Sequence, residues 1–181
     1  ESGKLASFGV DTWGVDFGFK WHPVKDMTIA ATGWYLYSSQ EMVYVGDEAV
    51  VEPGGRTRRF GLDLSARYEF LKDFYFQCDY TYSHARSIDD PRGQNYVPLA
   101  PVNTLATGLT WQHRGFTANA KARWLGDRPA NEDYSLTADG YCIVDLTAAY
   151  TFKRFTFGMA IDNLFNTKWK EAQFETEALI P

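Results

Sequence analysis

The sequence is poor in the features that mark several common classes of protein. Its net charge is −5 and its Lys and Arg residues form no basic tract, which argues against nucleic-acid binding. Only two of the 181 residues are cysteine, Cys78 and Cys142. Both fall on the apolar side of a strand pattern, and we interpret them as small hydrophobic residues rather than as a disulfide or a reactive pair.

Long hydrophobic runs are also missing, and no stretch could form an apolar helix that crosses a bilayer. This absence does not exclude a membrane, because a closed β-barrel satisfies all of its backbone hydrogen bonds between strands. No signal peptide begins at Glu1, so we expect a mature chain or an internal fragment of a longer one.

Signatures of enzymes and metal sites are lacking as well. The chain has no Gly-x-Ser-x-Gly, Walker or dinucleotide-binding motif. His22, His84 and His113 do not have the spacing of metal ligands, and we expect them to have ordinary surface roles. Ser83 precedes His84 on one strand, so their side chains would point to opposite faces and could not form a nucleophile–base pair. We therefore predict no enzyme activity, no metal and no cofactor.

Aromatic residues, in contrast, are abundant, with thirteen Phe, eleven Tyr and six Trp. In the runs 60–70 and 74–82, alternate positions are apolar or aromatic and every charge falls on the other parity. Successive side chains of a β-strand point to opposite faces, so each run has one apolar and one polar face. Leu64 and Phe76 lie on the apolar face and Asp63 on the polar one. This pattern is typical of a transmembrane β-strand with aromatic ends.

The same alternation predicts eight strands, most of them as long as the roughly nine to eleven residues that a tilted strand needs to cross a bilayer. Their expected ranges are 8–21, 27–45, 58–71, 73–87, 101–113, 115–127, 140–152 and 155–167. Tight connections alternate with long polar ones, which are expected at 46–57, 88–100, 129–139 and from 168 to the end. Outer-membrane barrels have short turns on one side and long loops on the other.

The chain also contains an internal repeat, whose copies share a strand start, a turn and an aromatic residue. A shift of forty-seven residues lays Gly14-Val15-Asp16 on Gly61-Leu62-Asp63, Lys25-Asp26 on Lys72-Asp73, and Tyr35 on Tyr82. The repeating unit is a strand–turn–strand hairpin, so we expect a meander of hairpins rather than a solenoid or a propeller.

Parity alone does not say which face lies inside, because a soluble barrel alternates too, with its apolar side inward. Here the apolar face carries more large side chains than the narrow interior of an eight-stranded barrel could hold. Its aromatic residues also gather near strand ends, Trp21 and Trp111 beside short turns and Tyr35 and Trp124 towards long loops. Such rings prefer the membrane interface. We therefore predict an all-β fold, an antiparallel transmembrane β-barrel meander with lipid against its apolar face.

Short motifs then point to one family. Ile161-Asp162-Asn163-Leu164-Phe165-Asn166, followed by Trp169, resembles the Asn-Leu-Phe-Asp/Asn signature on the penultimate barrel strand of TonB-dependent outer-membrane receptors. Gly14-Val15-Asp16 and Gly61-Leu62-Asp63 resemble the Gly-Val-Glu that recurs at strand starts in that family. Segment 97–103 is similar to the Pro-containing stretch that leads its strands back into the membrane.

The resemblance implies that residues 1–181 are the C-terminal part of a barrel of about twenty-two strands, without its last strand, its N-terminal plug domain and its TonB box. The implied location is the outer membrane of a Gram-negative bacterium, among lipid and lipopolysaccharide. The implied function is energy-coupled uptake of a scarce nutrient, foremost a ferric siderophore, or a cobalamin-like ligand. The TonB complex would drive this uptake through the plug.

Four charged residues of the polar face are candidates for the barrel lumen. They are Asp79, Lys121, Arg123 and Asp145. They would contact the substrate or the plug, or they would only solvate the wall and pair with the plug. Two other functions stay open at this point: a passive pore or small structural outer-membrane barrel, and a soluble lipid-binding barrel. Plug sequence upstream would exclude the passive barrel, and dependence on detergent would exclude the soluble one.

Overall fold

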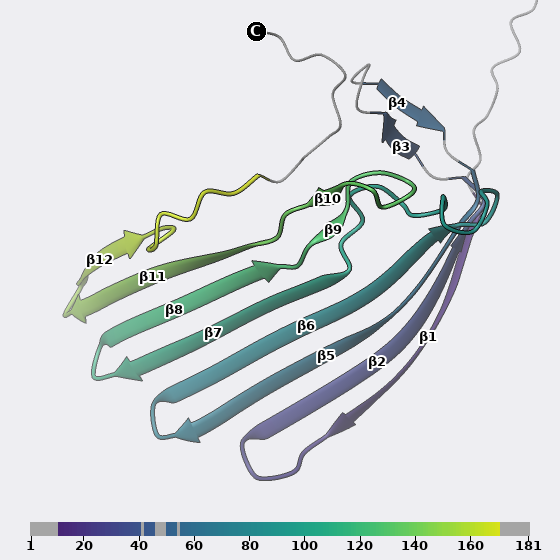
Figure 1. Cartoon of the computed structure of the whole chain (residues 1–181). Helices are drawn as coiled ribbons and strands as arrows, with labels where there is room; N and C mark the ends of the chain where they lie inside the picture. The colour runs from purple at the N-terminus through teal and green to yellow at the C-terminus, as the bar shows by residue number, and fades with distance from the viewer. Residues whose placement is uncertain (1–10, 41, 46–49, 54, 171–181) are drawn as a thin grey trace, which may run out of the picture.

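The structure, a computed structural model, describes residues 11–40, 42–45, 50–53 and 55–170. Eight strands form one antiparallel sheet in the order β1-β2-β5-β6-β7-β8-β11-β12 (Figure 1). Their bounds are β1 Thr12–Trp21, β2 Met27–Ser38, β5 Thr57–Leu71, β6 Phe74–Ser87, β7 Asn103–His113, β8 Phe116–Leu125, β11 Tyr141–Phe152 and β12 Phe155–Ile161. Within this part of the chain, no helix is long and apolar enough to cross a membrane. The predicted all-β antiparallel meander is confirmed.

The pairing register continues the two faces of each strand across the whole sheet. On one side Leu64 pairs with Ala31 and Tyr80, and on the other Asp63 pairs with Thr81. Paired residues of antiparallel strands point to the same side of the sheet. The apolar positions of all eight strands therefore gather on one face, which we call the apolar face. The charged positions lie on the other, polar face, except for the paired Arg58 and Arg86 at the ends of β5 and β6 next to the long connections.

The sheet is strongly curved (Figure 1). It is also open, because β1 and β12 each have a single neighbour in it. An open strand edge presents unpaired backbone N–H and C=O groups, which hydrocarbon cannot satisfy. The described residues thus form part of a barrel wall rather than a closed barrel.

Tight turns at one end of the sheet are built by residues in the left-handed backbone region. Asp26 (φ 64°) and Asp73 (φ 72°) occupy equivalent positions in the two hairpins of the repeat, which confirms the hairpin as the repeating unit. Arg114 (φ 44°) is followed by Gly115 (φ 83°), where an added Cβ would lie 2.7 Å from the carbonyl oxygen of Thr151. Only glycine fits this turn without strain.

One predicted strand, expected over 27–45, is wrong in length. It ends at Ser38, because its partners β1 and β5 reach only to Thr12 and Thr57. Beyond Ser38 the chain forms a separate hairpin. Its first strand, β3 (Met42–Val45), lies within the range expected for the longer strand, and its second, β4 (Val50–Pro53), lies within the connection expected over 46–57. The first strand begins at Thr12, and residues 8–10 of its expected range lie outside the described residues.

A second prediction, a strand over 155–167, is also wrong. The strand ends at Ile161, and Asn163 and Asn166 both adopt a φ of 50°. Asparagine tolerates the left-handed region, in which a strand cannot continue. The remaining strand ends lie within two residues of the predicted ones.

Long connections pack against one another at the end of the sheet opposite the tight turns. The amide of Tyr96 donates to the carbonyl oxygen of Glu132 (3.0 Å), which joins the β6–β7 connection to the β8–β11 connection. Within the latter, β9 (Arg128–Pro129) pairs with β10 (Thr137–Ala138). Ala138 and Ile143 are fully or almost fully buried here. We call this region the loop end.

Candidate lumen face

The apolar face exposes large hydrophobic side chains over its whole width. Phe17 is 82% exposed, Phe157 67% and Met159 64%. A protein surrounded by water rarely leaves so large a continuous apolar surface uncovered. This face therefore needs an apolar neighbour, and the described strands do not provide one.

All four lumen candidates lie on the opposite, polar face. Lys121 on β8 pairs with Asp145 on β11. Asp79 on β6 pairs with Ala106 on β7, which in turn pairs with Arg123 on β8. The four side chains thus occupy two adjacent rows that cross β6, β7, β8 and β11. The sequence placed them on the correct face, and their role there stays a prediction.

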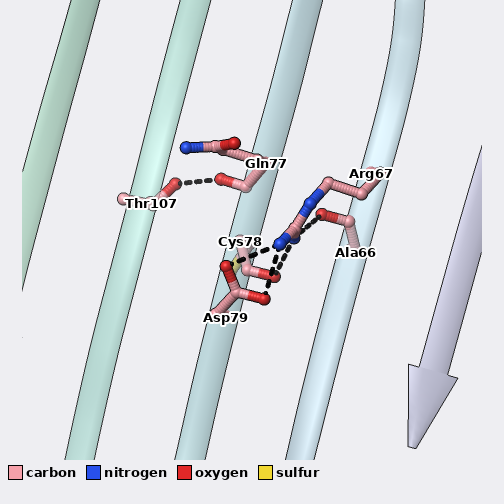
Figure 2. Close-up of polar contacts among 6 residues, drawn as sticks. All are labelled: Ala66, Arg67, Gln77, Cys78, Asp79 and Thr107. Carbon is pink, nitrogen blue, oxygen red and sulfur yellow. Dashed lines mark hydrogen bonds and ion pairs between the residues drawn. The ribbon is translucent and has the colours of Figure 1, made fainter.

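Asp79 is held by a neighbouring strand of the wall (Figure 2). Nη2 of Arg67 lies 2.9 and 2.8 Å from the two carboxylate oxygens of Asp79, and Nη1 donates to the carbonyl oxygens of Ala66 and Cys78. Both charged side chains are about half exposed, so the pair contributes little to stability. The pair does supply a hydrogen-bond donor to both oxygens of the Asp79 carboxylate, which leaves that carboxylate less available to a ligand.

Asp145 joins two parts of the wall. One carboxylate oxygen accepts the backbone N–H of Asn163 at 2.9 Å, and the other lies 3.4 Å from Nη2 of Arg123. The side chain of Asn163 closes the turn by accepting the N–H of Thr167 (2.9 Å), and the N–H of Leu164 donates to Val144 on β11 (2.7 Å). The Asn-Leu-Phe motif is therefore a turn fastened to β11 by Asp145.

Lys121 differs from the other three candidates. Its side chain makes no hydrogen bond or ion pair with any residue in the described ranges. It is exposed on the polar face, although its register partner is Asp145. Lys121 is therefore the candidate whose charge is most available to another molecule.

Trp34 is a residue of the polar face that the sequence did not single out. It pairs with Asp16 and Gly61, and an added Cβ at Gly61 would clash with the Trp34 ring and with the carbonyl oxygen of Tyr82. The indole of Trp34 therefore lies over Gly61 and occupies the space that a side chain at position 61 would need. The only signal in the sequence is a large aromatic residue on the parity of β2 that otherwise carries mostly small and polar residues, such as Thr28, Ala30 and Thr32.

Charged and aromatic contacts organise the loop end. Arg56 donates from its backbone N–H (2.8 Å) and from Nε (2.9 Å) to the Asp89 carboxylate. The guanidinium of Arg86 stacks 3.7 Å from the Tyr96 ring centroid. These contacts join the start of β5, the end of β6 and the connection that follows it.

Comparison with known proteins decides the family. Residues 11–164 match the family described as TonB dependent receptor-like, beta-barrel. The chain belongs to this family. Members of the family are outer-membrane β-barrel receptors, so the resemblance found in the sequence motifs is confirmed. None of the curated proteins matches the sequence.

Solved structures of receptor barrels share the fold. The ferric yersiniabactin uptake receptor FyuA from Yersinia pestis has a TM-score of 0.73 at 15% identity. The match covers 92% of this chain and 26% of FyuA. The ferric-catecholate import receptor Fiu from E. coli K12 has a TM-score of 0.69 at 18% identity, with 91% and 25% covered. The copper transporter OprC has a TM-score of 0.72 at 18% identity, with 89% and 26% covered. The chain thus spans about a quarter of their length.

The receptor family transports rather than catalyses, which confirms the expectation of no enzyme activity. Ser83 pairs with Gly61 on the polar face, whereas the ring centroid of His84 lies 4.7 Å from that of Phe60 on the apolar face. The side chains of Ser83 and His84 therefore lie on opposite faces, as predicted. Both cysteines are free. Over the described residues, no three His, Cys, Asp or Glu lie together as a metal site would require.

Removing the carboxylate of Asp145 should loosen the turn of the receptor motif. In Asp145→Ala the N–H of Asn163 loses its acceptor, and we expect the free energy of unfolding to fall by about 1–3 kcal/mol. Urea unfolding of the complete receptor measures this loss, and faster hydrogen exchange at Asn163 locates it. Asp162→Ala is the matched control, because the Asp162 side chain makes no hydrogen bond or ion pair with the described residues. Equal stability of the two variants would contradict the assigned role.

The Arg56–Asp89 contact should respond to acid in a defined direction. Hydrogen bonds from Arg56 hold the pKa of Asp89 below its ordinary value of 3.8. A carboxylate with a lowered folded-state pKa stabilises the fold above its ordinary pKa, and this contribution is lost as pH falls through the lowered value. We expect the hydrogen bond from the Ile88 amide to the Arg56 carbonyl oxygen (2.8 Å) to persist at pH 4 and to open below it.

Hydrogen exchange of the Ile88 amide as a function of pH measures this opening. In Arg56→Gln the pKa of Asp89 should return towards its ordinary value, so the opening should move to higher pH. An unchanged profile in this variant would show that Arg56 does not set the transition.

Proposed function

We propose that the chain is the C-terminal part of the barrel of an outer-membrane receptor that imports a ferric siderophore by TonB-coupled transport. The proposal is supported chiefly by the division of the sheet into an apolar face and a charged polar face, in a chain that matches the receptor family over residues 11–164. Two of the three solved structures described above are named for ferric ligands. The plug domain would be supplied by another part of the same protein.

On this proposal the polar face borders the lumen and the loop end faces the medium. Asp79 and Asp145 are already engaged by the wall, and Arg123 is shared with Asp145. Lys121 therefore carries the main attraction for an anionic ferric complex or for a carboxylate of the plug. The other three residues maintain the wall.

Uptake of radioactive iron by cells that produce the complete receptor tests this function. Ferric-catecholate and ferric-citrate complexes serve as probes, with and without TonB. We expect uptake of one probe to require TonB, and Lys121→Gln to lower its apparent affinity about fivefold, the effect of losing roughly 1 kcal/mol of attraction. Lys25→Gln, in a tight turn, is the control for net charge. TonB-independent uptake would instead support a passive pore.

A further inference from the structure

A groove on the apolar face lies outside the function proposed so far. It has a volume of about 290 Å³ and crosses β7, β8, β11 and β12. Its floor is made by Ala118, Ala120 and Ala148. Ala118 pairs with Ala148, and Ala120 is the next residue of β8 on the same face. Trp111 forms one wall and Met159 the other. These small residues lie between bulkier ones and leave a channel along the surface.

Positive charge flanks the groove at the end nearest the tight turns. The two turns beside it contribute Arg114 and the pair Lys153-Arg154, and neither turn contains a carboxylate. Nζ of Lys153 lies 5.4 Å from the ring centroid of Phe152, a residue of the apolar face. The row of Ala118 is three residues from Gly115, or about 10 Å at the usual rise per residue of a strand.

One carboxylate, that of Asp73, lies in the preceding turn. It lies 2.7 Å from Nδ1 of His113, and the three cations outnumber it. A molecule in the groove would therefore meet an apolar channel with net positive charge about 10 Å from its floor. An apolar channel next to a cluster of cations matches a phospholipid, in which an acyl chain is esterified close to a phosphate.

We propose that this groove is a binding site for an anionic glycerophospholipid. One acyl chain lies over the alanine floor, and the phosphate contacts Arg114, Lys153 and Arg154. The inference rests on the proposed function in one respect, because it requires lipid to surround the apolar face. It adds a specific lipid site to that face, where the barrel wall alone would require only a hydrocarbon solvent.

Native mass spectrometry of the complete receptor, purified in detergent, tests the site. The probes are phosphatidylglycerol and phosphatidylcholine with identical acyl chains. We expect one phosphatidylglycerol to be retained in preference to phosphatidylcholine. Replacing the cations in Arg114→Gln, Lys153→Gln and Arg154→Gln should weaken retention of phosphatidylglycerol about fivefold for each cation removed. Lys25→Gln with Lys72→Gln, in turns away from the groove, should change it little.

Filling the groove supplies the second arm. Ala118→Phe with Ala120→Phe should abolish retention of both lipids, whereas Ala66→Phe, on the apolar face of β5, should not. A shift of the folded band on unheated gels confirms that each variant folds, and Ala120→Leu replaces the double variant if it does not. Equal retention of the two lipids, or retention unaffected by filling the groove, would overturn the proposal. So would a dimer that occupies the groove in place of lipid.

Failure of this inference can be told apart from failure of the proposed function. The same variants are assayed for TonB-dependent iron uptake and for recovery in the outer-membrane fraction. A receptor that imports iron but shows no lipid preference would refute the lipid site alone. A protein absent from the outer membrane would refute the proposed function.

Discussion

Leu64→Arg is expected to prevent stable insertion of the receptor into the outer membrane. Leu64 lies at the middle of β5 on the apolar face, between Ala31 and Tyr80 of the neighbouring strands. An arginine that faces lipid at the bilayer midplane costs about 2–4 kcal/mol. This cost is a large share of the roughly 5–15 kcal/mol that stabilises a typical protein. Folding into vesicles, followed by urea unfolding, measures the loss.

Ser65→Arg is the matched control, because its side chain points to the polar face and its register partner is Asp79. We expect this variant to insert and to unfold within about 1 kcal/mol of the native receptor. If Leu64→Arg inserts as well as Ser65→Arg, the apolar face does not contact hydrocarbon.

Gly61→Val is expected to give the second largest effect. A Cβ at this position would meet the backbone carbonyl oxygen of Tyr82 and the ring of Trp34 at distances that real Cβ atoms do not adopt. The indole can rotate away, whereas the backbone of β6 can move only by disturbing the β5–β6 ladder. Overpacking of this kind costs about 1–3 kcal/mol and occasionally more. A lower urea midpoint and altered Trp fluorescence should appear together.

Gly33 offers an internal comparison on the neighbouring strand. An added Cβ there meets nothing within 4 Å, so Gly33→Val should leave stability unchanged or raise it through higher strand propensity. Similar destabilisation by the two substitutions would mean that strand glycines matter for flexibility, and that close packing of Trp34 does not explain Gly61.

Much of this fold could be predicted from the sequence because a barrel wall repeats one rule. The two-residue period fixes the face of every side chain, and the register carries that assignment from Leu64 to its neighbours on β2 and β6. The positions of the tight turns could also be predicted, because Asp26 and Asp73 occupy matching positions of the repeat. The two residues share the left-handed conformation. Both signals are local.

One of the two wrong strand ends depends on partner strands, and the other on asparagine residues that take the chain out of the strand conformation. Ser38 ends β2 because β1 and β5 stop there. The polar run 38–41 lies at this limit, but the apolar run 42–45 that follows it extended the predicted strand. At the candidate site, the parity of Asp145 was predictable. Its hydrogen bond to Asn163 was not, because that turn was expected to be a strand. Trp34 was missed for a different reason. Its place above Gly61 depends on the pairing between β2 and β5, which the sequence does not specify.

The account depends on hydrocarbon being the neighbour of the apolar face, and spin labels along β5 test this most directly. Labels at positions 62 to 67, introduced one at a time after both cysteines are replaced, report exposure to dissolved oxygen, which concentrates in lipid, and to a polar nickel reagent. We predict oxygen maxima at positions 62, 64 and 66, with minima at 63, 65 and 67. Oxygen maxima on the odd positions, or the absence of a two-residue period, would contradict the account.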